Sequence, residues 1–529
     1  MMQKEYPLQE FRYGEDLLTV GRAIRLVRGL EKGVLTDAAR RKVSQSHRII
    51  ADIVRNHRIV YGINTGFGPL CTTRIDEQDT KTLQYNLLMS HSVGVGKPVD
   101  GEIAKLMLIL KAHSLAKGYS GVSPDTLGRI IWHIDQGVIP CVPEQGSVGA
   151  SGDLAPLSHL FLPLIGMGTV CSGDGMKPAA EVLQQLGMQP IELGPKEGLA
   201  LINGTQFMSA HAVMIVEKMQ NCLDHADIIA AINLEAMMGS VKSFDEELHT
   251  LRPYAGCVYV AERMRILLQN SKIVESHRNC TRVQDPYSLR CIPQVHGASR
   301  NAWLHLKEIV TTEINSVTDN PIVFSEEKTI SGGLFHGQPI ALPLDYAGLA
   351  AAELGNIADR RIYLSMTETV PGLPKMLMEN TGLNSGLMIL QYTSAALVSE
   401  NKTLCFPASA DSIPTALGQE DHVSMGSISA RKTLHIVKNL EKILAIELIT
   451  SAQGFDFRKP LKSGILVDAA HEFIRRFISF HENDRILYED IERAVSLIQS
   501  KEIISHLNRT AGKHQLNFQN EQHEQFGIY

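Results

Sequence analysis

The run GSVGASGDLAPLSH at residues 146–159 holds the residues whose types and spacing are best suited to chemistry. Its small residues allow the backbone to turn tightly and to approach another group closely. A phosphate-binding loop is disfavoured, because both the G-x-G-x-x-G spacing and a following Lys-Ser or Lys-Thr are missing. A serine nucleophile on an elbow is also disfavoured, because Asp153 stands where the second glycine belongs. The ordinary interpretation is a tight turn before a helix, with Asp153 as the cap.

The order Ala150-Ser151-Gly152 also permits a reaction of the backbone with itself. The unhindered nitrogen of Gly152 can approach the carbonyl carbon of Ala150, and attack at that carbon closes a five-membered ring. Loss of two waters, one of them from the Ser151 side chain, leaves a methylene group conjugated to the ring. The product would be a strong electrophile made without an added cofactor.

Several longer blocks accompany this loop along the chain. They are YGINTGFG (61–68), EGLALINGTQ (197–206), QDPYSLRCIPQVHGA (284–298), VTDNP (317–321), SGGLFHGQP (331–339) and GQEDHVSM (418–425). In sequence and order, the loop and these blocks resemble the aromatic amino acid ammonia-lyases, which build a methylidene-imidazolone group from Ala-Ser-Gly. Matches of this length in order are far more specific than one short motif. The resemblance extends over residues 55–455 and is closest to the histidine branch of the family.

The resemblance implies that the protein removes ammonia from an amino acid and leaves a trans α,β-unsaturated acid. In the histidine branch, L-histidine becomes trans-urocanate in the first step of histidine degradation. The electrophile from Ala150, Ser151 and Gly152 would bond to the substrate amine and make it a better leaving group. Attack on the aromatic ring is the alternative route, and both stay open here. The resemblance implies no external cofactor and no metal ion.

Two of the implied catalytic residues come from the YGINTGFG and LINGT segments. Tyr61 would remove the β-proton, which requires its surroundings to lower a pKa that is about 10 in a free tyrosine. Asn203 would form hydrogen bonds near the electrophile and the substrate amine. Taken alone, Tyr61 is better interpreted as a packing aromatic residue beside a Gly-rich turn, and Asn203 as a turn residue in an Asn-Gly pair; the resemblance reverses the first interpretation.

Four more residues are placed at the substrate by the resemblance. Arg290 would bind the substrate carboxylate, because a planar guanidinium group offers two parallel donors. Gln284 and Tyr287 would line the same site, with Tyr287 among the catalytic residues. Phe335 would pack over the substrate ring or the electrophile. Without the resemblance, Arg290 would be interpreted as a surface ion pair and Phe335 as a core residue.

Substrate choice is implied to depend on Ser90-His91 and on Glu420. Phenylalanine lyases typically carry Phe-Leu where this chain has Ser90-His91, whereas some tyrosine lyases also carry a histidine there. Glu420 can accept a hydrogen bond from an imidazole N–H. Facing a phenyl ring instead, the same carboxylate would be buried without a partner, which costs free energy. These residues favour L-histidine, and tyrosine or phenylalanine lyases and aminomutases of the same family remain alternatives.

Two positions depart from the family pattern close to the implied site. Leu334 and Gly418 stand where family members usually carry asparagine. Both changes leave Tyr61 and the Ala-Ser-Gly segment intact, so the lyase interpretation holds while the exact substrate stays open. A non-catalytic relative and a serine hydrolase acting through Ser151 are alternatives from other functional classes.

Composition and charge are typical of a soluble globular protein. Of 529 residues, 44% are hydrophobic and 20% are charged. The 51 Lys and Arg against 57 Asp and Glu give a net charge of −6 without a basic block, so nucleic acid is not an expected partner. The eight cysteines are scattered and form no C-x-x-C pair, which predicts reduced thiols rather than disulfides or bound zinc.

The sequence also predicts no membrane association and a cytoplasmic location. The first sixteen residues lack the apolar segment of a signal peptide. The apolar stretch 381–399 contains Asn, Gln, Ser and Thr, so we expect a buried core helix rather than a membrane span.

Apolar residues at three- and four-residue spacing predict long helices over 303–317 and 344–364, the first of them ending at Asp319-Asn320-Pro321. The stretch 427–453 is long and contains neither Pro nor Gly, which predicts a third long helix. We therefore expect a mainly α fold. Residues 1–205 would form a smaller loop-rich part with the electrophile and the Tyr61 loop, residues 206–507 a long helix bundle, and residues 508–529 a polar tail. The resemblance further implies a homotetramer with helices bundled at its centre and active sites built from three chains.

Overall fold

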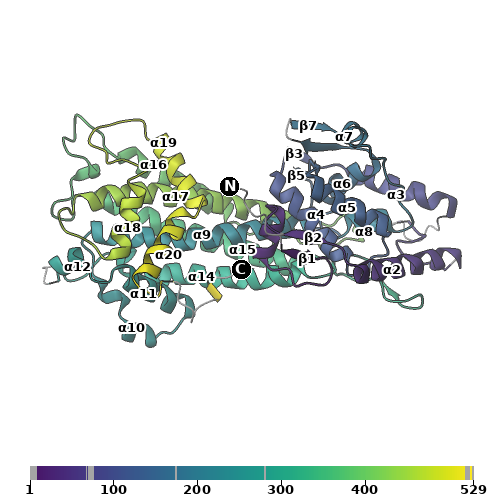
Figure 1. Cartoon of the computed structure of the whole chain (residues 1–529), viewed down its shortest axis with the longest axis horizontal. Helices are drawn as coiled ribbons and strands as arrows, with labels where there is room; N and C mark the ends of the chain where they lie inside the picture. Colours follow the sequence, from purple (N-terminus) through teal and green to yellow (C-terminus); the bar gives the residue numbers. More distant parts are fainter. Residues whose placement is uncertain are drawn as a thin grey trace, which may run out of the picture. The chain divides into compact units, whose positions relative to one another are not determined.

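The structure is a computed structural model that describes residues 9–56, 58–66, 68, 75, 77–172, 175–278, 282–518, 525–526 and 529. These residues form twenty α-helices and nine short strands, which confirms the predicted mainly α fold (Figure 1). They divide into two compact units. The predicted division at residues 205 and 507 stays a prediction.

The first unit comprises the described residues of Met1–Met214, together with Lys307–Asp345 and Pro407–Arg431. Its helices are α1 (Val20–Val27), α2 (Asp37–Arg55), α3 (Glu77–His91), α4 (Gly101–Leu115), α5 (Pro124–Gln136), α6 (Leu154–Phe161), α7 (Ala179–Gln185) and α8 (Glu197–Ile202). Its strands are β1 (Glu10–Arg12), β2 (Lys32–Val34), β3 (Val95–Pro98), β4 (Ile139–Pro140), β5 (Pro143–Gln145), β6 (Thr169–Ser172), β7 (Gly175–Pro178), β8 (Ile322–Val323) and β9 (Thr329–Ile330). Short 3-10 turns cover Leu162–Ile165 and Ala416–Gly418.

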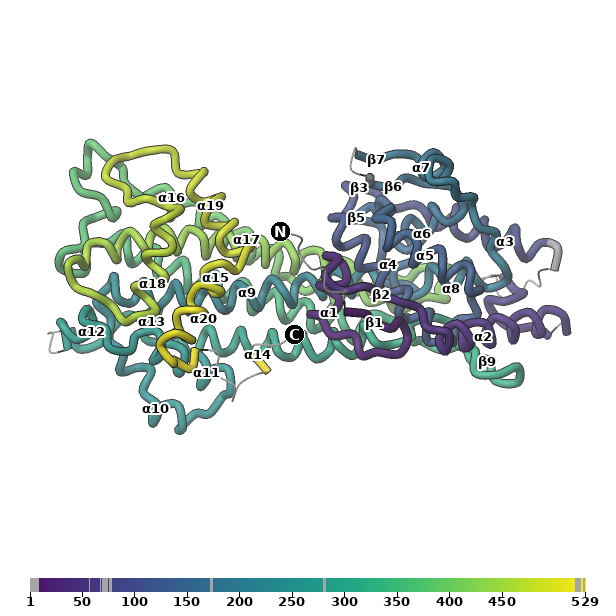
Figure 2. The backbone as a smooth tube through the Cα atoms, in the orientation of Figure 1, coloured from purple at the N-terminus to yellow at the C-terminus, as the bar shows by residue number. Residues whose placement is uncertain are grey.

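The strands of this unit form small separate pairings (Figure 2). β1 and β2 are parallel, with Phe11 opposite Gly33. The pairs β3–β5, β4–β6, β6–β7 and β8–β9 are antiparallel. Strands of two to four residues are too short to show an alternation of apolar and polar side chains. For that reason the sequence did not reveal them.

Local signals in the sequence fix where several helices begin and end. The Thr36 hydroxyl accepts a hydrogen bond from the Ala39 N–H at 3.1 Å and so caps the start of α2. Ser123 caps α5 in the same way, with Pro124 at the first helical position. Gly137 ends α5 in the left-handed conformation, at φ 65°.

The second unit comprises Ile215–Leu306, Tyr346–Phe406 and the described residues of Lys432–Tyr529. Its shorter helices are α10 (Glu246–Thr250), α11 (Ala255–Leu267), α12 (Lys272–Ser276), α13 (Tyr287–Arg290), α16 (Met388–Leu404), α18 (Ile465–Ile474), α19 (Tyr488–Gln499) and α20 (Glu502–Lys513), with 3-10 turns at Val241–Phe244 and Lys375–Leu377. The predicted tail begins inside α20, and Phe518 and Phe526 within it are buried.

Four long helices contain four of the five chain positions at which one unit gives way to the other; the fifth lies after α16, between residues 406 and 407. The four helices are α9 (Gln206–Ala236), α14 (Ile292–Ile314), α15 (Gln338–Ser365) and α17 (Gly426–Asp456). Within the second unit the Asn233 amide on α9 donates to Ser365 on α15 at 2.9 Å and to Ser451 on α17 at 3.2 Å. The Trp303 indole on α14 donates to the Val216 carbonyl of α9 at 2.8 Å. The predicted helices 344–364 and 427–453 lie within α15 and α17.

Two of the predicted helices differ from the structure. α14 ends at Ile314, before the predicted stop at Asp319-Asn320-Pro321. Just beyond its end, the Asn315 side chain accepts from the N–H of Leu18 at 2.9 Å and donates to the Leu18 carbonyl at 2.8 Å. The prediction of a buried helix over 381–399 is wrong: α16 begins only at Met388, and in this chain Tyr392 is 58% exposed. Its apolar residues do not gather on one buried face. Among the described helices, none is both long enough and apolar enough to span a lipid bilayer.

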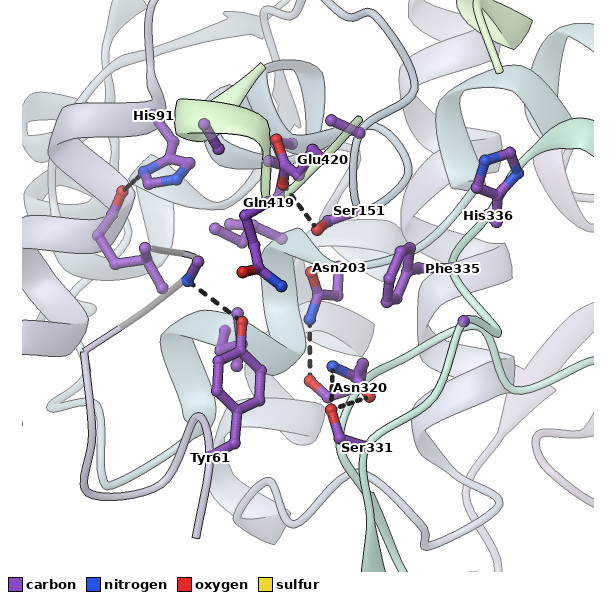
Figure 3. A pocket seen from close by; sticks show the side chains of 18 of the residues that line it. Tyr61, His91, Ser151, Asn203, Asn320, Ser331, Phe335, His336, Gln419 and Glu420 are labelled. Atoms are coloured by element: carbon purple, nitrogen blue, oxygen red, sulfur yellow. Dashed lines mark hydrogen bonds between the residues drawn. The ribbon is translucent and has the colours of Figure 1, made fainter. Parts of the chain in front are cut away.

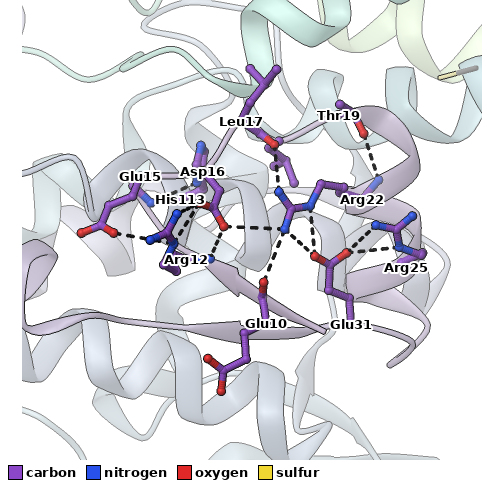
Figure 4. A network of polar contacts seen from close by, with 12 residues as sticks. Glu10, Arg12, Glu15, Asp16, Leu17, Thr19, Arg22, Arg25, Glu31 and His113 are labelled. Carbon is purple, nitrogen blue, oxygen red and sulfur yellow. Dashed lines mark hydrogen bonds and ion pairs between the residues drawn. The ribbon is translucent and has the colours of Figure 1, made fainter. Parts of the chain in front are cut away.

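The N-terminal segment is attached to α4 by a polar network (Figure 4). The buried Glu31 carboxylate accepts from the Arg22 guanidinium at 2.6 Å and from Arg25 at 3.0 Å. The Gly14 N–H donates to Nδ1 of His113, a buried residue of α4, at 3.1 Å. The position of α4 is therefore tied to the start of the chain.

Candidate active site

A cavity of about 850 Å³ lies in the first unit (Figure 3). Side chains reach it from α3, from the loop before α6, from α8 and from the loops around residues 320, 331–336 and 416–423. Seven of the predicted site residues line this cavity: Tyr61, His91, Ala150, Ser151, Asn203, Phe335 and Glu420. Segments up to 359 residues apart in sequence, from Tyr61 to Glu420, thus meet at one volume.

Small residues let the Ala-Ser-Gly loop lie directly against the Asn203–Gly204 segment. The Gly204 N–H donates to the Ser151 carbonyl at 3.2 Å, and the Asp153 N–H donates to the Gly204 carbonyl at 2.8 Å. A Cβ atom on Gly152 would overlap that Gly204 carbonyl oxygen. Ser151 and Gly152 both have positive φ, 49° and 83°. Gly152 is therefore required by the close approach of two backbones.

Asp153 fastens this loop to α9. Its Oδ2 accepts hydrogen bonds from the backbone N–H groups of Phe207 at 3.0 Å and Met208 at 3.1 Å, in the first turn of that helix. Burial raises the pKa of Asp153 to about 7, although the two N–H donors oppose the rise. The residue was predicted to cap the helix that follows it, which is α6. It makes no side-chain cap there and bonds the start of α9 instead.

Tyr61 and Asn203 are each held by a backbone group. The Gly68 N–H donates to the Tyr61 hydroxyl at 3.3 Å. The Asn203 amide donates to the Asn320 carbonyl at 2.9 Å. Asn320 is fixed in turn, because its Oδ1 accepts from the Gly332 N–H at 2.8 Å. With its nitrogen engaged, Asn203 has its carboxamide oxygen left to act as an acceptor.

His91 lies at the C-terminal end of α3. Its Nδ1 lies 2.8 Å from the Leu87 carbonyl and therefore carries the hydrogen of that bond. Burial lowers the pKa of His91, while the Leu87 carbonyl and the charge of Glu420 oppose the shift. A neutral imidazole with a fixed tautomer is the form present near neutral pH.

Glu420 follows a strained turn and faces Ser151. Its Oε1 accepts from the Ser151 hydroxyl at 3.3 Å, and its Oε2 accepts from the Thr415 hydroxyl at 2.9 Å. Ala416, Leu417 and Gly418 between them all have positive φ, of 49°, 56° and 86°. For Ala416 and Leu417 this is an unfavourable conformation, of the kind that concentrates at functional sites.

The family departures border the cavity without lining it. Phe335 and His336 line the cavity, but the neighbouring Leu334 does not and is 56% exposed. Ala416 and Gln419 also line it, whereas Gly418 does not. Gly418 takes the left-handed conformation at φ 86°, where a glycine is less strained than an asparagine.

Three predicted site residues lie in the second unit and do not line this cavity. Gln284 is exposed, Tyr287 on α13 is 70% exposed, and the Arg290 guanidinium stacks 4.4 Å above the Tyr287 ring. The Arg290 Nε donates to the Asp285 carbonyl at 3.1 Å. Within this chain Tyr287 and Arg290 thus contact each other, away from the cavity.

The sequence predictions missed several polar residues of the cavity wall. Asn320 and Ser331 lie in blocks that the sequence identified, VTDNP and SGGLFHGQP, and their hydrogen bonds to each other and to Asn203 give them a positioning role. His336 and His422 stack with ring centroids 5.7 Å apart. For Asn320, the Asn-Pro pair in VTDNP was the feature of the sequence that could have drawn attention to this residue. Within the described part of the chain, no group of three or more His, Cys, Asp or Glu side chains is arranged to hold a metal ion.

Comparison with known proteins places this geometry among lyases. The family model for aromatic amino acid lyase matches residues 18–476. The histidine ammonia-lyase of Sorangium cellulosum is 50% identical over 460 residues, which cover 86% of this chain and 90% of that protein. The crystal structure of histidine ammonia-lyase from Trypanosoma cruzi has a TM-score of 0.88 at 40% identity, covering 95% of this chain and 96% of that one. A tyrosine aminomutase from Streptomyces globisporus has a TM-score of 0.89 at 33% identity, covering 96% and 99%.

Proposed function

The chain belongs to the aromatic amino acid lyase family, and from that premise we propose that it eliminates ammonia from L-histidine to give trans-urocanate, the first step of histidine degradation. It is a carbon–nitrogen lyase. The observation that carries the substrate assignment is that Ser151, Tyr61 and Glu420 line one cavity of about 850 Å³. An electrophile, a base and an acceptor for an imidazole N–H thus face a volume that holds an amino acid.

Ala150, Ser151 and Gly152 fit the formation of a methylidene-imidazolone. The positive φ angles of Ser151 and Gly152, 49° and 83°, give a tight turn, and Gly152 has no side chain to obstruct its nitrogen. Attack of that nitrogen on the Ala150 carbonyl carbon and loss of two waters require no oxidant, external cofactor or metal ion. The group supplies an electrophilic methylene that makes the substrate amine a better leaving group.

Tyr61 is proposed to remove the β-proton of the substrate. The N–H of Gly68, 3.3 Å from its oxygen, favours the phenolate by donating to the negative charge. The proton passes to Tyr61, the C–H electron pair forms the double bond, and the C–N pair leaves with ammonia. Asn203 presents its carboxamide oxygen to the substrate ammonium, because Asn320 already takes its amide nitrogen.

Glu420 supports histidine as the substrate. A carboxylate held by Thr415 at 2.9 Å keeps further lone pairs for an imidazole N–H. A phenyl ring would offer the Glu420 carboxylate no donor and would make contact with a charged group without a hydrogen bond between them. The likeness to a tyrosine aminomutase keeps a second candidate, a tyrosine or phenylalanine lyase or aminomutase of the same family.

Substrate carboxylate binding is proposed to come from neighbouring subunits. The cavity in the first unit of this chain is not lined by Arg290, Tyr287 or Gln284. Tyr287 is 70% exposed in the single chain. We infer a cytoplasmic homotetramer in which these three side chains complete the sites of other subunits. The partner chemistry is thus a small amino acid and further copies of this chain, with no role for nucleic acid or membrane.

The test is a near-ultraviolet assay of the purified protein with L-histidine, L-tyrosine and L-phenylalanine in parallel. We expect urocanate absorbance to rise with histidine alone and to be absent in Ser151→Ala. Turnover of tyrosine or phenylalanine in place of histidine would overturn the substrate assignment. A β-amino acid among the products would identify an aminomutase.

A further inference from the structure

Lys111 is a buried cation in α4, a helix whose buried side chains are mostly apolar. It interrupts the segment LMLILKAHSL of α4 and is 1% exposed. Burying an ammonium group costs several kcal/mol unless it is well bonded. Its Nζ donates to the backbone carbonyl of Asn203 at 2.5 Å. The carboxylate nearby, Asp319, is bridged by another buried lysine, Lys196, at 2.8 Å.

The bond from Lys111 reaches the electrophile loop through a single peptide group. The Asn203 carbonyl that accepts from Lys111 belongs to the Asn203–Gly204 peptide, whose N–H donates to the Ser151 carbonyl at 3.2 Å. A cation on the oxygen of a peptide makes its N–H a stronger donor, because hydrogen bonds in a chain polarise one another. A Cβ atom on Gly204 would overlap Gln206 and Thr318, so this peptide sits in a tightly enclosed place.

The Ser151 carbonyl matters to the proposed chemistry. In the ring that Ala150, Ser151 and Gly152 would form, this oxygen is conjugated with the methylene carbon. Electron density moves toward the oxygen when a nucleophile adds to that carbon, so a stronger donor at the oxygen speeds the addition. Burial lowers the pKa of Lys111 to about 8, against the attraction of Asp319, and the protonated form prevails at neutral pH.

We propose that Lys111 is a positioning residue that activates the electrophile through the Asn203–Gly204 peptide. This role rests on the proposed function, because it presupposes that the ring forms. It also fixes the backbone from which the Asn203 side chain projects. Lys111 itself does not line the cavity and therefore has no direct contact with the substrate to offer.

The test compares Lys111→Met with Lys111→Arg and with Lys105→Met, which removes a partly exposed charge from the same helix. Intact mass reports whether two waters have been lost. The near-ultraviolet band, taken as the difference from Ser151→Ala, reports the conjugated group, and its decay with sodium borohydride reports how fast hydride adds to the methylene. Turnover of L-histidine is measured in parallel.

We expect Lys111→Met to lose both waters, to absorb at a shorter wavelength and to react with borohydride about tenfold more slowly. Its kcat should fall by a similar factor with little change in KM, Lys111→Arg should recover part of the loss, and Lys105→Met should match the wild type. If Lys111→Met does not fold, Lys111→Gln, which keeps a neutral donor, has the same expected direction.

A wild-type band position and borohydride rate in the folded, matured variant would overturn the proposal. So would a folded Lys111→Met that keeps its two waters, since the lysine would then serve ring formation instead of ring reactivity. Wild-type protein that keeps both waters would refute the proposed function itself, which separates the two failures.

Discussion

Tyr61 and Ser151 approach the cavity from different parts of the first unit, Tyr61 from the turn after α2 and Ser151 from the loop before α6. This separation lets proton removal be tested apart from the electrophile. In Tyr61→Phe we expect kcat for L-histidine to fall about 10²–10⁴-fold, because the phenol oxygen is the proposed base. Intact mass should still show the loss of two waters. A kcat within a few-fold of the wild type would assign the base elsewhere.

Glu420 is expected to contribute to binding of the L-histidine side chain. Glu420→Gln keeps the shape and loses the charge, so kcat/KM for L-histidine should fall about ten- to hundredfold as a charge-assisted hydrogen bond becomes a neutral one. Thr415→Val is the matched control, because it removes one hydrogen bond to Glu420 and keeps the carboxylate. Steady-state kinetics with both variants decide the matter. Equal losses in the two would mean that orientation of Glu420, and not its charge, governs substrate binding.

Much of the site at this scale follows from sequence, and particular residues explain why the rest does not. Ala150, Ser151, Tyr61 and Glu420 lie in recognisable blocks and line one cavity. Lys111 belongs to no block, and its hydrogen bond depends on how α4 packs against the Asn203 loop. A single lysine in LMLILKAHSL was the signal available. Arg290 and Tyr287 were found by motif, yet they do not line the cavity in the single chain.

At the scale of elements, α4 links the electrophile loop to the start of the chain. Besides Lys111 it carries His113, whose Nδ1 accepts from the Gly14 N–H at 3.1 Å and whose Nε2 lies 3.3 Å from the Asn315 side-chain oxygen (Figure 4). Burial lowers the pKa of His113 to about 4, with repulsion from Lys117 adding to the shift. The His113 imidazole is therefore neutral in the folded chain near neutral pH.

This predicts acid sensitivity that His113 helps to set. Below its ordinary pKa of 6.5 the unfolded chain binds a proton at this histidine that the folded chain binds only near pH 4, so the free energy of unfolding falls between those values as the pH drops. In His113→Asn, which keeps an acceptor for Gly14, the drop in urea midpoint from pH 7 to pH 5 should be smaller than in the wild type. An unchanged drop would place the sensitivity in other buried histidines.

The long helices could be predicted from the sequence, and the short strands could not. The three- and four-residue spacing of apolar residues located most of α15, and a long stretch without Pro or Gly located α17. The strands of two to four residues have no such pattern. The end of α14 was predicted a few residues too late, and the residue just beyond it, Asn315, bonds Leu18, 297 positions away in the sequence, a contact that no local pattern reveals.

At the scale of the whole molecule, the proposed shared site predicts complementation between inactive variants. Ser151→Ala lacks the residue proposed to form the electrophile, and Arg290→Met lacks the group proposed to bind the substrate carboxylate. When the two are co-expressed with different tags and hybrids are isolated, about a quarter of the sites should combine an intact Ser151 with an intact Arg290 from another chain. Activity near a quarter of the wild type is expected. Isolated hybrids without activity would mean that each chain builds its site alone.

The contact between Asp153 and the first turn of α9 has a further consequence. Its partners, the N–H groups of Phe207 and Met208, lie 54 and 55 residues along the chain, so the turn they hold is complete only after folding. On the proposed chemistry, ring closure needs that turn. The missing mass of two waters would then persist in a denatured chain and distinguish molecules that had once folded from molecules that never had. The covalent state of the loop would thus show, even after denaturation, whether a given molecule had folded before.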